Sequence, residues 1–518
     1  MKSYLVRRRF NPAAASGNET IKVFLPVGFG TPKFGISFFV NGGEGELLDE
    51  TSLDRAFGLG FIGLAASDNS SIAWMGGIGL THSLTHSAGI GTTLRKAVSG
   101  FNTASRMTYE LKTDRTVTRQ ATSPVFYQDR LEFNFQNTSA SSSYLDIIIV
   151  LFSGDDIDAR IGSVSLNTTN NLTTTVTGVA FAPDVVLTLA TGQALTSADA
   201  DARFSFGCAI KSPSIKNSCS FFRMRSNASG ASGTAATTVH QYFSTDRCHL
   251  MYAFTGNALL SGEITAFTND GFTVTSRSSF PNSITNIMVY MALKSTRSGT
   301  FDLQDFTTST STGISGVATS NFIPSLLLGV LGSATSTGAT ITSNDSTGYS
   351  IFAAKSLSSK SIYGSGTLSV SSGSTQVTGT GTTFRSLSPG DKILNTSNVE
   401  IGKVSYVSSD TSLFLSSNAS STITSVNYSV LPVQEFSAII GSSNLSEPTK
   451  IFSGLLSSPI YSAIYGTSGS ASEIVDGVVN NFDSYPGFKV NYSTANATAR
   501  KGWFLAFKDN ENRRRDAN

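Results

Sequence analysis

Residues 144–152 read YLDIIIVLF, an almost unbroken apolar run between a serine-rich stretch and the polar residues Ser153-Gly154-Asp155. A short apolar run bounded by turn residues is typical of a strand that is buried on both faces. Similar runs return at residues 284–294, which read ITNIMVYMALK, and at residues 499–508, which read ARKGWFLAFK. Three related strands predict that one structural unit occurs three times along the chain.

Two further landmarks precede each of these strands. One reads DRLEFNF at residues 129–135, DGFTVT at 270–275 and PGFKVN at 486–491, and the other begins at Phe61, Phe206 and Phe352. The second landmark recurs after about 145 residues both times, whereas the terminal strand recurs after about 140 and then about 214 residues. The third unit therefore holds roughly 70 additional residues, placed after Phe352.

These spacings divide the chain into a first unit at residues 1–160, a second at 161–300 and a third at 301–518, with a small domain inserted at 363–430. Each unit consists of short alternating or apolar runs separated by Gly, Asn, Ser and Asp, which indicates strands and turns. About 140 residues suit a β-sandwich or jelly roll. We therefore predict an all-β fold with three tandem, jelly-roll-like β-sandwiches and a small β-domain inserted in the third.

Composition excludes several other classes of protein. The 518 residues include 140 Ser and Thr, 35 Phe and 15 Tyr but only 14% charged residues, which argues against disordered chains and coiled coils. Three cysteines argue against a disulfide scaffold. The net charge of +2 indicates no nucleic-acid partner. No apolar run reaches the roughly 20 residues that a membrane-spanning helix needs, and the arginines at 7–9 stand where a secretory signal would need its apolar core.

The inserted segment carries the one specific motif. Residues 366–384 read GTLSVSSGSTQVTGTGTTF, residues 387–391 read LSPGD, and residues 410–415 read DTSLFL. A strand–Gly-Ser–strand hairpin, a Leu-x-Pro-Gly-Asp turn and an Asp-Thr-x-Leu-x-Leu strand in this order resemble the small β-domain that recurs in bacteriophage tail fibres, spikes and other virion proteins. The resemblance covers Gly366–Leu415 and implies a virion structural protein, made without a signal peptide in the cytoplasm of a host bacterium.

Candidate chemical sites are weak by comparison. His82 and His86 would share a helical face, and Cys208, Cys219 and Cys248 fall in one unit, but neither set has the complete ligand spacing of a metal site. We therefore expect no catalytic residue, no cofactor and no metal. Glycan contacts are suggested by residue type alone, at Trp74, Tyr363 and Trp503. A basic arm that docks onto an acidic virion partner is suggested at Arg7, Arg8 and Arg9.

The leading hypothesis is a non-enzymatic structural component of a tailed-phage virion, associated with the tail as part of a fibre, spike or baseplate, with host-surface attachment. Neutral Thr- and Ser-rich strands leave sheet edges poorly protected, so we expect a homo-oligomer, a trimer, in which other subunits cover those edges. Two alternatives stay open: a capsid decoration or cement protein, and a carbohydrate-binding adhesin that holds host-surface glycan.

Overall fold

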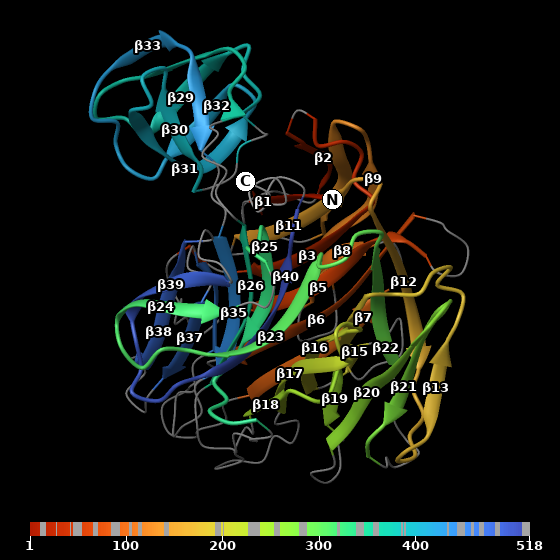
Figure 1. The fold of residues 1–518 in the computed structure, drawn as a ribbon. Helices are drawn as coiled ribbons and strands as arrows, with labels where there is room; N and C mark the ends of the chain where they lie inside the picture. The colour runs from red at the N-terminus through yellow and green to blue at the C-terminus, as the bar shows by residue number, and fades with distance from the viewer. Residues whose placement is uncertain are drawn as a thin grey trace.

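The fold is all-β in a computed structural model of the chain (Figure 1). The structure describes residues 1–509 except for the segments 11–16, 27, 42, 45–53, 66–70, 84–93, 103–105, 112–116, 139–143, 192–197, 200, 226–238, 253–258, 279–286, 319–321, 338–346, 356–361, 385–386, 388–389, 432–434, 443–450, 457–459, 466–470 and 482–486. Three tandem β-sandwiches and one inserted β-domain account for the described strands, which confirms the predicted fold class.

The first sandwich pairs a large sheet with a four-stranded sheet. In spatial order the large sheet contains β1 (Lys2–Phe10), β11 (Leu145–Ser153), β3 (Phe34–Asn41), β5 (Asp54–Leu64), β6 (Ser71–Ser83) and β7 (Leu94–Asn102). The small sheet contains β2 (Gly17–Phe24), β10 (Arg130–Asn137), β9 (Val117–Phe126) and β8 (Arg106–Leu111).

The second sandwich repeats this arrangement. Its large sheet contains β12 (Ile157–Ser165), β22 (Ile287–Ser295), β14 (Val185–Ala190), β16 (Asp201–Ile210), β17 (Lys216–Arg225) and β18 (Val239–Ser244). Its small sheet contains β13 (Thr173–Val176), β21 (Gly271–Ser276), β20 (Leu259–Thr268) and β19 (His249–Tyr252).

The third sandwich has the same strand order again. Its large sheet contains β23 (Phe301–Thr307), β40 (Lys501–Phe507), β25 (Leu326–Leu331), β26 (Thr347–Lys355), β35 (Glu435–Ser442) and β36 (Ile451–Leu456). Its small sheet contains β24 (Gly313–Ala318), β39 (Gly487–Thr494), β38 (Ala471–Asn481) and β37 (Ile460–Tyr465). In all three sandwiches the first strand therefore pairs with the last, although they lie more than a hundred residues apart along the chain.

The inserted domain interrupts the connection between β26 and β35, which are neighbours in one sheet. Its eight strands form one curled sheet in the order β27 (Ile362–Tyr363), β34 (Tyr428–Leu431), β30 (Lys392–Asn395), β31 (Glu400–Ser409), β32 (Ser412–Leu415), β29 (Gln376–Thr380), β28 (Thr367–Val370) and β33 (Ile423–Val426). The sheet surrounds a core of its own, and the domain projects from one end of the molecule (Figure 1).

Each large sheet is buried on both faces because its central strands are mostly apolar. In β11, Ile147 and Ile149 face the core of their own sandwich, whereas Ile148, Val150 and Phe152 face a second core. The matching strands β22 and β40 divide their residues in the same alternating way. The second core contains residues from all three sandwiches, so the three large sheets pack against one another around a shared interior.

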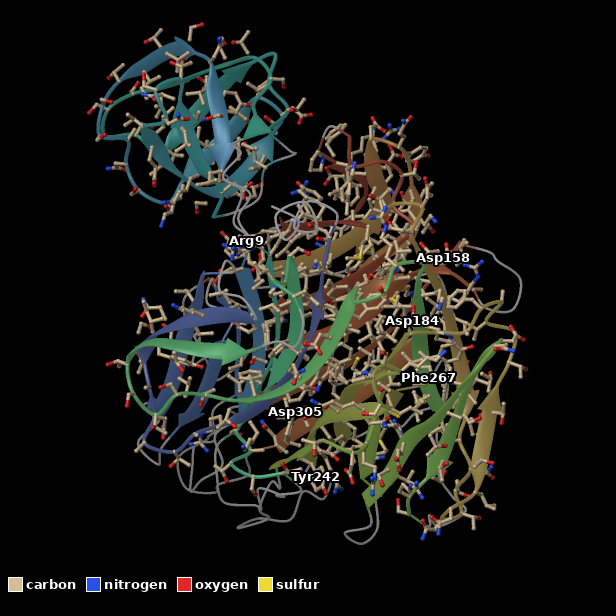
Figure 2. The ribbon with its side chains drawn as sticks, in the orientation of Figure 1. Arg9, Asp158, Asp184, Tyr242, Phe267 and Asp305 are labelled. Carbon is tan, nitrogen blue, oxygen red and sulfur yellow. The ribbon has the colours of Figure 1, made fainter. Side chains whose placement is uncertain are left out.

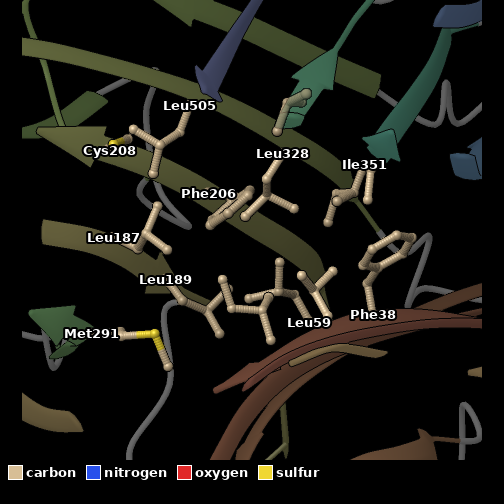
Figure 3. Close-up of a cluster of buried hydrophobic side chains, with 14 of the residues drawn as sticks. Phe38, Leu59, Leu187, Leu189, Phe206, Cys208, Met291, Leu328, Ile351 and Leu505 are labelled. Atoms are coloured by element: carbon tan, nitrogen blue, oxygen red, sulfur yellow. The ribbon is translucent and has the colours of Figure 1, made fainter. Parts of the chain in front are cut away.

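Aromatic residues mark the centre of this shared core. Phe57 of β5, Phe204 of β16 and Tyr349 of β26 contact one another, with ring centroids 5.4–6.1 Å apart. Figure 3 shows another part of this core, where side chains of the three sandwiches such as Phe38, Phe206 and Leu328 lie close together. The three phenylalanines that begin the second landmark are not in equivalent positions of the three sandwiches. Phe61 and Phe206 face the shared core, whereas Phe352 faces the third sandwich's own core.

The sandwiches also contact one another in a cyclic order. Ala65 of the first sandwich forms an isolated bridge with Ile161 of the second. Lys216 of the second lies 3.2 Å from Asp305 of the third, and the Lys355 ammonium of the third donates a 3.0 Å hydrogen bond to Ser3 of the first. The contacts thus run from one to two, two to three and three back to one.

Short segments cover the outer edges of the large sheets in the same cyclic sense. β15 (Ala198–Asp199) of the second sandwich pairs with β7 of the first, and β4 (Gly43–Glu44) of the first pairs with β36 of the third. At β18 of the second, the Gln241 side chain exchanges 2.8 Å hydrogen bonds with Gly348 and Ser333 of the third. These three edges of the large sheets are therefore covered from within the chain and do not themselves require other subunits.

Candidate functional site between the inserted domain and the first sandwich

The arginines at the start of the chain lie in strand β1 rather than in a free arm. Side chains alternate along a strand, so Arg7 and Arg9 share one face and meet the carboxylate of Asp146 on the neighbouring strand β11. The Arg7 Nε–Asp146 Oδ1 distance is 2.8 Å, and Arg9 Nη2 lies 2.9 Å from Asp146 Oδ2. Figure 2 labels Arg9 of this cluster.

The environment of Asp146 keeps this carboxyl group ionised. Burial alone would raise its pKa, but Arg7 and Arg9 together hold the pKa below its ordinary value. Asp146 is fully buried and Arg7 is 2% exposed. Two guanidinium groups that neutralise an internal carboxylate are not presented to a separate acidic partner, so the predicted docking role does not fit Arg7 and Arg9.

Arg8 points to the opposite face of β1 and contacts the inserted domain. Its Nη1 atom donates to the Arg7 carbonyl at 2.9 Å and to the Leu387 carbonyl at 3.3 Å. Leu387 begins the Leu-x-Pro-Gly-Asp motif, and Asp391, which ends it, acts on Arg8 electrostatically. Burial lowers the pKa of Arg8, and burial raises the pKa of neighbouring Tyr4 to about 12. Leu387 and Asp391, the first and last residues of that motif, therefore lie close to Arg8 of the first sandwich.

A groove of about 740 Å³ lies beside this contact, between strand β31 of the inserted domain and the first sandwich. Its floor includes the stacked rings of Phe10 and Phe135, whose centroids are 3.8 Å apart. A volume of this size is within the usual range for ligand pockets. The groove is lined by residues from β1, β2, β10 and the inserted domain: Arg8, Arg9, Phe10, Gly17, Asn18, Glu19, Thr20, Ile21, Lys22, Phe24, Phe135, Asn137, Leu387, Tyr406, Val407, Ser408 and Asp410.

The aromatic residues proposed from sequence for glycan contact are not gathered in this groove. Trp503 is fully buried in the shared core, 5.0 Å from the ring of Phe206, so it cannot contact a glycan. Trp74 is partly buried against the same core. Tyr363 belongs to β27, and its side chain lies outside the described residues. Trp74 and Trp503, the two of these residues whose side chains the structure describes, therefore do not line the groove.

The cysteines also do not form a reactive or metal-binding group. All three thiols are free and buried, and burial raises the pKa of Cys219 to about 12. A thiol ligand must lose its proton to bind a metal, and burial disfavours that loss. The described residues contain no group of three or more potential metal ligands. His82 lies in strand β6, not a helix, and His86 lies outside the described residues.

The groove could not be predicted from the sequence, because its two walls are almost 400 residues apart in the chain. Residues 20–23, which read TIKV, alternate polar and apolar side chains, a short signal for a strand. That this strand lies at the edge of a sheet is known only from the structure, in which β10 is its one described neighbour. The contact of Leu387 with β1 has no local signal at all.

No protein-family model matches the chain, and no curated protein matches it. The described residues contain no helix that is long and apolar enough to cross a membrane.

Proposed function

We propose that this chain is a non-enzymatic structural component of a tailed-phage virion, associated with the tail as part of a fibre, spike or baseplate and contributing to host-surface attachment. The observation that carries the proposal is the arrangement of three sandwiches of identical strand order around one core, with a single domain projecting from one end. The projecting domain is also the segment that resembles the small β-domain of phage tail appendages.

The threefold arrangement within one chain determines the oligomeric state that we expect for this protein. Symmetric appendages commonly use several identical subunits, whereas here three sandwiches take the places that three subunits would occupy. One chain would then fill one position and present one inserted domain rather than three. Sedimentation velocity on the purified protein tests this point: we expect a single species of 54.5 kDa. A species with three times that mass would instead support the homotrimer expected from the sequence.

A capsid decoration protein is the second candidate, because a block with internal threefold order also suits a threefold position on a shell. Purified particles distinguish the two functions. We expect the chain among the particle proteins, at a few dozen copies, and an antibody against it should label the tail in negative-stain images. Labelling over the head with hundreds of copies would favour the decoration function, and absence from the particle would reject both.

The non-enzymatic part of the proposal has its own test. Purified protein should release no reducing ends from the surface polysaccharide of the host. Measurable release would show that the chain is an enzyme.

A further inference from the structure

We infer that the groove beside the inserted domain is a strand-addition site, which accepts an extended, uncharged segment of a neighbouring virion protein along the open edge of β2. The added segment would become a fifth strand of the small sheet of the first sandwich. This inference rests on the proposed virion function, because it takes its partner from the same particle.

Among the strands that the structure describes, β2 is the outermost of its sheet and pairs with β10 alone. Which residues of β2 form hydrogen bonds with β10 follows from Leu25, whose N–H donates to the Asp129 carbonyl at 2.8 Å. Hydrogen-bonded pairs recur at every second residue of an antiparallel ladder, so the peptide groups of Val23, Ile21 and Glu19 face β10. The peptide groups of the alternating residues then face away from the sheet, at its outer edge; these residues are Asn18, Thr20, Lys22 and Phe24, and all four line the groove.

These four residues make no backbone hydrogen bond with any other described part of the chain. At roughly 3.3 Å per residue, the eight residues of β2 offer a pairing edge of about 26 Å. A row of unpaired N–H and C=O groups is the template that an added strand requires.

The equivalent edge in the second sandwich is protected differently. Its outer strand β13 has four residues instead of eight, and the Asn167 side chain donates a 2.8 Å hydrogen bond to the Thr173 carbonyl at that edge. Proteins commonly shorten or cover edge strands to prevent unwanted pairing. The longer and less covered edge of β2, combined with the opposite wall supplied by the inserted domain, distinguishes the first sandwich from the second.

The lining of the groove indicates what kind of segment fits. Its charged residues already have partners within the chain: Arg9 binds Asp146, Lys22 lies 3.8 Å from Glu132, and Arg8 binds carbonyl groups. Glu19 and Asp410 likewise interact within the chain. The lining therefore carries both charge signs, and each described charged residue already interacts within the chain, so no excess of one charge favours a charged segment.

Apolar surface in the groove is placed for alternate side chains of an added strand. Phe24 is 36% exposed at the end of β2, and Leu387, Tyr406 and Val407 stand on the side of the inserted domain. A segment rich in Thr, Ser and Val would pair through its backbone and direct its apolar side chains onto these residues.

Hydrogen exchange of the full chain, measured by mass spectrometry, tests the inference. In the purified protein we expect fast exchange at the amides of Asn18, Thr20, Lys22 and Phe24, and in the intact particle we expect slow exchange of the same peptide. Equally fast exchange in the particle would overturn the inference and leave the proposed function intact. Protection that rises with concentration of the purified protein would overturn it in favour of a second copy of this chain.

A pair of variants tests the backbone requirement. Lys22→Pro removes the outward N–H at an edge position where proline is tolerated, and Lys22→Ala removes the same side chain but keeps the N–H. We expect Lys22→Pro to reduce incorporation into particles about tenfold, as the loss of one or two hydrogen bonds implies, while Lys22→Ala resembles the wild type. Equal loss in both variants would overturn the inference, and the exchange experiment remains decisive if Lys22→Pro folds poorly.

Discussion

The rings of Phe57 and Phe204 belong to different sandwiches, yet their centroids lie 5.4 Å apart with the ring planes at 76°. Edge-to-face contacts of this kind are favourable beyond the area that they bury. Tyr349 of the third sandwich closes the triangle at 5.9 and 6.1 Å. Because each ring contacts both of the others, the stability of each sandwich is linked to that of its neighbours.

Replacing Phe57 by alanine should therefore destabilise the whole assembly of sandwiches. Truncation of a fully buried phenylalanine costs about 3–5 kcal/mol. Trp503 lies in the shared core but in the third sandwich. Its fluorescence during urea unfolding, measured in a Trp74→Phe background because Trp74 lies in the first sandwich, reports the effect at a distance. We expect a lower unfolding midpoint for Phe57→Ala. Ile314→Ala, at a residue 62% exposed, is the control, and an unchanged midpoint for Phe57→Ala would contradict the linked core.

Asp146→Asn should lower the free energy of unfolding, because it leaves Arg7 and Arg9 without their buried partner. Removing one member of a buried ion pair typically costs about 3–5 kcal/mol. The folded-state pKa of Asp146 is lowered, so its stabilisation is present above the unfolded-state pKa and is lost as the pH falls through the folded-state value. The free energy of unfolding in urea should thus be much lower for the variant than for the wild type at neutral pH, and this difference should become smaller in acid.

Asp158→Asn provides the matched control for this measurement. Its carboxylate lies 3.2 Å from the Lys33 ammonium, but both side chains are substantially exposed. Exposed pairs contribute little, so this variant should unfold like the wild type. If Asp146→Asn behaved in the same way, the buried cluster would have no stabilising role.

How far the sequence predicts this fold is clearest in strand β11. The uninterrupted run at Ile147–Phe152 correctly predicts burial of both faces, and the landmarks predict three sandwiches with one insertion. The run does not reveal that its second face packs against the other sandwiches of the same chain. An apolar face specifies only that it must be covered, and either a second chain or a second repeat can cover it.

The candidate site was less predictable for a related reason. Three consecutive arginines suggest a solvated arm, but strand alternation turns Arg7 and Arg9 toward Asp146, which lies more than a hundred residues away. Trp503 was proposed for ligand contact by residue type, although the strand that contains it is buried on both sides. Both outcomes depend on long-range pairing of first and last strands, which local sequence does not encode.

Glu435 should make stability depend on pH in the opposite sense from Asp146. Burial raises its pKa to about 8, partly offset by the Val479 N–H that donates to its carboxylate at 3.0 Å. A raised folded-state pKa means that stability is complete below the ordinary value of 4.5 and declines as the pH rises toward about 8. Glu435→Gln stays neutral and should lack this decline when thermal midpoints are compared between about pH 5 and pH 9.

The control for this prediction is Glu400→Gln in the inserted domain. Glu400 forms a 3.1 Å ion pair with Lys392 in which both side chains are 41% exposed, so its replacement should leave the pH profile of the sandwiches unchanged. Parallel profiles for wild type and Glu435→Gln would rule out an effect of Glu435 on stability.

Arg8→Ala should loosen the inserted domain without unfolding it. The core of the domain is formed by its own residues and does not include Arg8. The position of the domain is held in part by the bond from Arg8 to the Leu387 carbonyl and by attraction to Asp391. Small-angle X-ray scattering of the variant should give a larger radius of gyration than wild type. Arg247→Ala, which removes a partly exposed arginine paired with Asp246 in the second sandwich, should leave the scattering profile unchanged. Identical profiles for all three proteins would show that Arg8 does not hold the domain in place.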